Sequence, residues 1–173
     1  MPKIIKDGDI VEDYCDYIDP PTGFTTVVSV TVTSQPCCTE RTSIVSLDHW
    51  LSQRTQLLAT DKAVGIWLEG HCDLSLIIND LPFFDVIAVY FSAFTDGRGF
   101  SLGNQLRERY HFLGELRAIG SLLPDQMYYL HRCGFNAAAT NPKDLHLARE
   151  ALTDFSNNYQ ETWSDANPIF RRR

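Results

Sequence analysis

The sequence has little that would mark a membrane or secreted protein. No segment approaches the ~18 consecutive apolar residues that a membrane helix needs, and the opening MPKIIKDGDIVEDY lacks the apolar stretch of a signal peptide. The five cysteines are an odd number without a repeated spacing, so neither a disulfide framework nor a paired zinc motif is indicated. We therefore expect a cytoplasmic protein with reduced thiols and no membrane partner.

Basic residues and cofactor motifs are also scarce. The chain has 15 Lys and Arg against 22 Asp and Glu, a net charge of −7, and a pI near 5.1. Affinity for a phosphate backbone comes from Lys and Arg displacing counterions, so we expect no nucleic-acid partner. We find no flavin, haem, iron–sulfur or nicotinamide motif, no metal-ligand spacing and no evident carboxylate pair for acid–base catalysis. Catalytic residues and cofactors therefore stay unassigned.

What is present is typical of a globular α/β protein. Its 173 residues, 44% of them hydrophobic, suit about one domain. Asp7-Gly8 between two apolar pairs predicts a hairpin, and the alternating GFTTVVSVTVTS predicts another strand. We predict one α/β domain over 1–159, with a β-rich section over 1–42, βα units over 43–159, and a mobile tail over 160–173.

From Ser43 onward, short apolar runs alternate with amphipathic segments. The expected strands lie near Ile44 to Leu47, Ala63 to Leu68, Val86 to Phe91, Glu115 to Ile119 and Phe135 to Ala139. Helices are expected after a cap at Asp48, after Asp73, through Leu102, Leu106 and Tyr110, from Pro124 to Gly134, and from Leu145 to Tyr159. Connections through helices favour a mainly parallel sheet, either open or curled into a partial barrel.

Parallel strands bring the loops at their carboxyl ends to one edge of the sheet, where α/β proteins bind ligands. Four loops are expected there: Glu69 to Asp73, Ser92 to Ser101, Gly120 to Gln126 and Thr140 to Asp144. They would gather Glu69, His71, Asp96, Arg98, Ser121, Asp125 and Asn141. This edge is the predicted site.

The stretch FTDGRGFS leaves the predicted strand Val86 to Phe91 and enters a helix. Gly97 and Gly99 would let the backbone approach a ligand closely, and Arg98 carries a fork that matches an oxyanion. This pattern is typical of an anion-binding turn. The alternative is that Asp96 and Ser101 cap the turn and the helix while Arg98 makes a surface ion pair.

Arg117 is unusual because ELRAIG reads as an interior strand, where a charge needs a partner. Asp96, Asp125 or a bound anion would supply one. The alternative is a pair with Glu115 on the same strand face. His71-Cys72 has the residue types of a base and a nucleophile, although neighbours in a loop do not set that geometry.

The stretches FTDGRGFS, LRERY, GELRAIG, DQMYYLHRCGF and PIFRRR resemble the bacterial domain-of-unknown-function family 934. The resemblance covers nearly the whole chain and is weakest between Cys15 and Ser43. It implies a protein of assimilatory sulfite reduction, either an oxidoreductase or an accessory factor, because the family's label rests on gene neighbours such as sulfite reductase and phosphoadenylylsulfate reductase. The implied partners are sulfite reductase or other sulfate-assimilation proteins. The alternative is a non-catalytic assembly or carrier factor that binds sulfite reductase.

The family pattern also covers residues outside the turn and differs from this chain at two positions. It includes Arg107, Arg109, Tyr110, Glu115, Arg132 and Cys133. Tyr90 and Ser121 stand where family members often have Asp, so the resemblance supports binding more than catalysis. The residues that we predict to bind a small anion are Thr95, Asp96, Gly97, Arg98, Gly99, Ser101, Arg117, Asp125 and Gln126.

Overall fold

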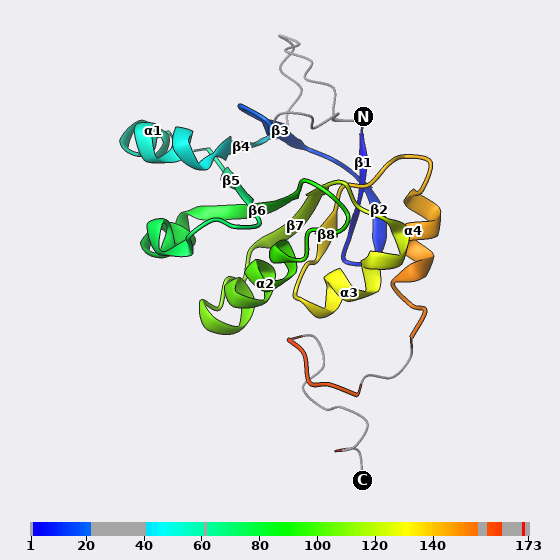
Figure 1. The fold of residues 1–173 in the computed structure, drawn as a ribbon. Helices are drawn as coiled ribbons and strands as arrows, with labels where there is room; N and C mark the ends of the chain where they lie inside the picture. Colours follow the sequence, from blue (N-terminus) through cyan, green and yellow to red (C-terminus); the bar gives the residue numbers. More distant parts are fainter. Residues whose placement is uncertain (1, 22–40, 61, 156–158, 164–170, 172–173) are drawn as a thin grey trace.

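The computed structural model describes residues 2–21, 41–60, 62–155, 159–163 and 171. The predicted strand in GFTTVVSVTVTS, together with Cys37 and Cys38, lies outside these residues. The described part is an α/β fold built on one sheet of eight strands in the order β2-β1-β8-β7-β6-β5-β4-β3 (Figure 1). The strands are β1 (Lys3–Lys6), β2 (Asp9–Glu12), β3 (Cys15–Tyr17), β4 (Thr42–Ser46), β5 (Val64–Glu69), β6 (Phe84–Phe91), β7 (Glu115–Gly120) and β8 (Ala137–Ala138).

The sheet is mixed but mostly parallel. Strands β3 to β8 pair in parallel, and β1 pairs antiparallel with both β8 and β2. The parallel pairing of β6 with β7 confirms the predicted common edge. The predicted hairpin is also confirmed, because Asp7 and Gly8 adopt φ of 51° and 88°, the left-handed pair that a tight two-residue turn between twisted strands requires.

The sheet curls into an open half-barrel. Strands β2 and β3 are the two outermost strands, yet only Asp13 and Tyr14 separate them in the chain. A link from Glu12 to Cys15 spans at most about 11 Å, so the two edges must approach each other at this end. Figure 1 shows the blue chain crossing from β2 toward β3. The curl decides between the two sheet shapes left open by the sequence.

The helices and turns are α1 (Leu47–Ala59), η1 (Leu74–Leu76), η2 (Ile78–Phe83), α2 (Arg98–Asn104), η3 (Gln105–Arg109), η4 (Pro124–Gln126), α3 (Met127–Arg132) and α4 (Leu145–Ala151). The α-helices pack on the outer face of the sheet, where Trp50, Leu102, Leu130 and Ala148 join one large core with Ile66, Ile87 and Leu116. A smaller cluster, which includes Tyr17, Ala88 and Ile119, lies on the inner face.

Two helix boundaries differ from the prediction. The cap of α1 is Ser46, whose hydroxyl accepts a hydrogen bond from the His49 backbone N–H at 3.1 Å, because the strand passes into the helix without a loop. The predicted cap Asp48 lies in the first helical turn instead. Helix α4 ends at Ala151, well before Tyr159, and the Thr153 hydroxyl donates to the Glu150 carbonyl, a local bond that competes with continued helix.

Candidate functional site

Three loops meet at the carboxyl edge of the sheet, as the parallel order requires. Gly70, the residue directly after β5, lies so close to Gly99 in the loop after β6 that a methyl group on Gly70 would come within 2.9 Å of the Gly99 nitrogen. The Gln126 side-chain amide, in the loop after β7, joins this loop to the one after β6, because it donates to the Phe94 carbonyl at 2.8 Å and accepts from the Leu123 N–H at 3.1 Å. These contacts confirm that the loops after β5, β6 and β7 form one surface.

The turn FTDGRGFS is organised by Asp96. One carboxylate oxygen of Asp96 accepts from the Arg98 backbone N–H at 3.2 Å and from Arg98 Nε at 2.9 Å, and the other lies 2.7 Å from Nη2. The hydrogen bonds from Arg98 lower the pKa of Asp96 from 3.8 to about 2. The Asp96 carboxylate therefore occupies the Arg98 backbone N–H, between Gly97 and Gly99, and pairs with the Arg98 side chain, as in the alternative of a turn capped by Asp96 with a surface ion pair.

The two glycines have different surroundings. Gly97 adopts an ordinary φ of −77°, and a methyl group there would meet nothing within 4 Å. Gly99 is buried, and a methyl group there would come within 2.6 Å of the Phe91 ring. The small size of Gly99 is thus required by packing inside the protein, whatever the loop binds.

The other residues predicted at this edge make few contacts with the turn or with one another. Thr95, Ser101 and Asp125 are exposed, and none of their side chains bonds to another residue in the described ranges. The Ser121 hydroxyl lies 3.5 Å from the Ser92 carbonyl. Asn141 accepts from the Lys143 N–H at 3.1 Å, and no described contact joins it to the turn.

Acidic groups dominate the β5 side of the edge. His71 Nε2 lies 3.2 Å from the Glu69 carboxylate, and the Glu69 charge also reaches Arg98. Burial raises the pKa of the Cys72 thiol, so Cys72 is protonated near neutral pH. His71 thus pairs with Glu69, and the described residues show no contact between the His71 ring and the Cys72 thiol.

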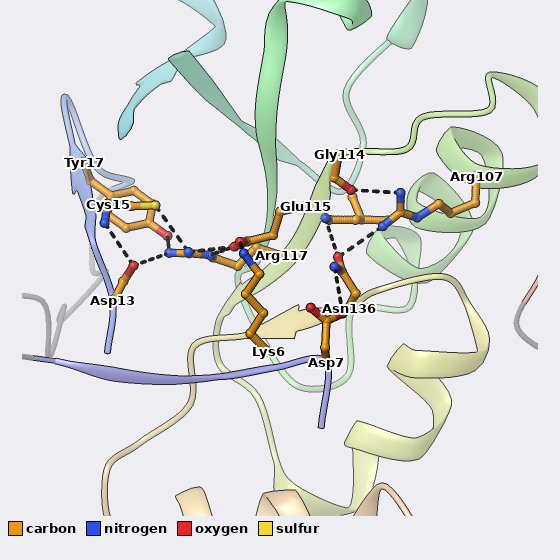
Figure 2. Close-up of polar contacts among 11 residues, drawn as sticks. Lys6, Asp7, Asp13, Cys15, Tyr17, Arg107, Gly114, Glu115, Arg117 and Asn136 are labelled. Atoms are coloured by element: carbon orange, nitrogen blue, oxygen red, sulfur yellow. Dashed lines mark hydrogen bonds and ion pairs between the residues drawn. The ribbon is translucent and has the colours of Figure 1, made fainter. Parts of the chain in front are cut away.

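Arg117 lies elsewhere, on the inner face of the half-barrel. Its guanidinium lies 2.7 Å from Glu115 Oε1 and 2.9 Å from Asp13 Oδ1, and it also contacts the Tyr17 hydroxyl and Cys15 Sγ, each at 3.3 Å (Figure 2). The expected pair with Glu115 is therefore present, whereas neither Asp96 nor Asp125 is a partner. Burial disfavours its charge, but the neighbouring acidic groups, Tyr17 first and then Glu115, Cys15 and Asp13, outweigh this and raise the pKa of Arg117.

The cluster extends to Lys6, whose Nζ lies 2.8 Å from Glu115 Oε2. Burial would raise the pKa of Glu115, but Arg117 and Lys6 outweigh it, and the pKa is lowered. Asp13, with a side chain 0% exposed, was missed by the sequence reasoning. The interior charge of Arg117 called for an acidic partner, yet nothing in the sequence singles out a residue 104 positions away.

Arg107 is a second buried arginine, held by backbone carbonyls. Its guanidinium donates to the carbonyls of Gly134 at 2.8 Å, Gly114 at 2.9 Å and Phe112, and to Asn136 Oδ1 at 3.1 Å. Burial lowers its pKa. Trp163, in the predicted tail, lies over this guanidinium with 4.9 Å to the ring centroid. Arg107 therefore links the entry of β7 to the entry of β8.

The ligand-binding role of the nine predicted residues stays a prediction. Among the described residues, no group of three or more His, Cys, Asp or Glu side chains is arranged to hold a metal ion. No helix in the described ranges is both long enough and apolar enough to cross a membrane.

Comparison with known proteins identifies the family and adds no named relative. No curated protein matches this chain. Residues 65–170 match a family model described as "Bacterial protein of unknown function" (DUF934). The match runs from β5 through the turn FTDGRGFS to the segment after α4, which is more than half of the chain. The chain therefore belongs to the bacterial family DUF934.

Proposed function

We propose that this protein takes part in assimilatory sulfite reduction and binds a small anion at the carboxyl edge of its sheet, with Arg98 as the main contact. Membership of DUF934 supports the pathway through the resemblance described above. The pathway, the anion and an oxidoreductase activity are all parts of this proposal.

The observation that carries the site is the fixed orientation of Arg98. Asp96 binds Nε and Nη2, while the side chain remains 62% exposed. A guanidinium held in this way keeps its third nitrogen, Nη1, directed away from Asp96 for a ligand. Asp96 also offsets the charge of Arg98, so the affinity for an anion should be moderate.

Calorimetric titration with sulfite, sulfate, phosphate and adenylated sulfur compounds tests the site. Arg98→Ala should weaken binding by about ten- to a hundredfold, as expected for loss of a charge-assisted contact, while the fold is kept. Arg109→Ala is the matched control, because it removes the same charge from an exposed arginine on η3. If wild type binds none of these anions, or if both variants bind like wild type, the turn is structural.

A genetic test separates the pathway from the site. Deletion of the gene should produce a sulfur requirement that sulfide rescues and sulfite does not. Absence of a sulfur phenotype would count against the pathway, whatever the titrations show.

A non-catalytic factor that binds sulfite reductase is the second candidate, and exposed apolar residues in the turn and in the loop after β7 favour it. Phe94 is 55% exposed and Leu123 is 41% exposed, and Gln126 holds their loops together. Phe94→Ser should then abolish capture of purified sulfite reductase, whereas Leu113→Ser, at a side chain 87% exposed before β7, should not. Equal capture by both variants would contradict this candidate.

A further inference from the structure

A cavity lies at the opposite end of the strands from the turn FTDGRGFS. It measures about 350 Å³ and opens between α3, the two residues that follow α4, and the pair β1–β8. The position of α4 beside β1 and β2 is visible in Figure 1. Its apolar wall includes Ile5, Met127, Leu130, Phe135, Ala138 and Leu152. Most of these side chains belong to the main core, so this wall offers water few hydrogen-bonding partners.

The polar part of the lining is small and lies at the amino end of β8. It consists mainly of Asp7, His131, Asn136 and Thr153. Asp7 is fixed in place, because its N–H donates to the Asn136 carbonyl at 2.8 Å and its Oδ1 accepts from Asn136 Nδ2 at 3.2 Å (Figure 2). Asn136 is itself held, since its Oδ1 accepts from Arg107 and from the Leu116 N–H. The carboxylate therefore has a defined position at the cavity.

The charge of Asp7 has no direct ion-pair partner among the described residues. Lys6, the preceding residue, is bound to Glu115 at 2.8 Å. Arg149 lies across the hairpin but donates to the Gly8 carbonyl at 3.0 Å and lies 3.4 Å from Asp9 Oδ1. Arg107 is connected to Asp7 only indirectly, because it donates to Asn136 Oδ1 while Asn136 Nδ2 donates to Asp7. Asp7 is exposed, and its Oδ2 accepts no hydrogen bond from any residue in the described ranges, so this oxygen is accessible to a ligand.

We propose that this cavity binds a small organic cation: a flat or branched apolar body of about ten heavy atoms that carries a protonated amine. The volume falls within the range of small-molecule sites, which combine an apolar wall with a few fixed polar groups. The apolar body packs against Leu130, Phe135 and Ala138, and the ammonium group donates to Asp7 Oδ2. This site is independent of Arg98 and of the proposed anion.

Titration of the full chain with phenethylamine, followed by amide NMR spectra, tests the proposal. The amides of Gly8, Leu130 and Asn136 should shift, and phenylacetate, with the same ring and the opposite charge, should bind at least about tenfold more weakly. Asp7→Asn should weaken phenethylamine by about tenfold, because one charge-assisted hydrogen bond becomes a neutral one, and should leave neutral 2-phenylethanol unchanged. Asparagine suits this site, since it tolerates the φ of 51° and keeps the acceptor for Asn136.

Asp9→Asn is the matched control, because it removes the same charge from the same hairpin outside the cavity lining. It should bind phenethylamine like wild type. Three results would each overturn the proposal: no shifts around the cavity at millimolar phenethylamine, equal affinity for phenylacetate, or equal weakening by Asp9→Asn and Asp7→Asn. The amide spectra of the free variants report whether each is folded.

Discussion

Replacement of Arg117 by methionine tests the physical account of the inner face most directly. Methionine fills much of the same space, but it removes every polar contact of the guanidinium. Glu115 keeps Lys6 at 2.8 Å. Asp13, fully buried, keeps only the Cys15 N–H at 3.1 Å as a described partner. Because a buried carboxylate is left without a counter-charge, we expect Arg117→Met to cost about 3–5 kcal/mol of the free energy of unfolding.

The assay is urea unfolding followed by tryptophan fluorescence. With a denaturant slope of about 2 kcal/mol per molar, this loss lowers the midpoint by about 1.5–2.5 M. The double variant Arg117→Met/Asp13→Asn removes the stranded charge, so its loss should be about 1–3 kcal/mol smaller than the sum of the two single losses. An Arg117→Met variant within about 1 kcal/mol of wild type, or strict additivity, would refute this account.

Two further predictions concern the turn. Gly99→Ala should unfold at lower urea than Gly97→Ala, because only the former places a methyl group against the Phe91 ring; equal midpoints would contradict the packing role. Arg98→Ala should raise the pKa of Asp96 from about 2 toward 3.8, measured by carboxyl-carbon NMR. Since the folded pKa is depressed, the stabilisation from this pair is present above about pH 3.8 and is lost as the pH falls toward 2; an unchanged pKa would show that Arg98 is not its cause.

The positions of most described strands and the parallel order were predictable from the sequence because they depend on local patterns, whereas β3 was not predicted. Continuous apolar runs separated by amphipathic segments favour buried parallel strands, and Asp7-Gly8 has the backbone freedom of a hairpin turn. The pairing of Asp96 with Arg98 is equally local, since the two residues are two positions apart, and it was one of the alternatives that the sequence offered.

Other features were decided by the tertiary structure. The short link between β2 and β3 brings the two sheet edges together, and this curl carries Asp13, Cys15 and Tyr17 to Arg117. Helix α1 takes Ser46 as its cap because β4 enters the helix directly. These outcomes depend on which distant surfaces meet when the sheet closes. A one-dimensional pattern indicates which side chains are stabilised by burial or need a partner, but the three-dimensional packing determines which residue that partner is.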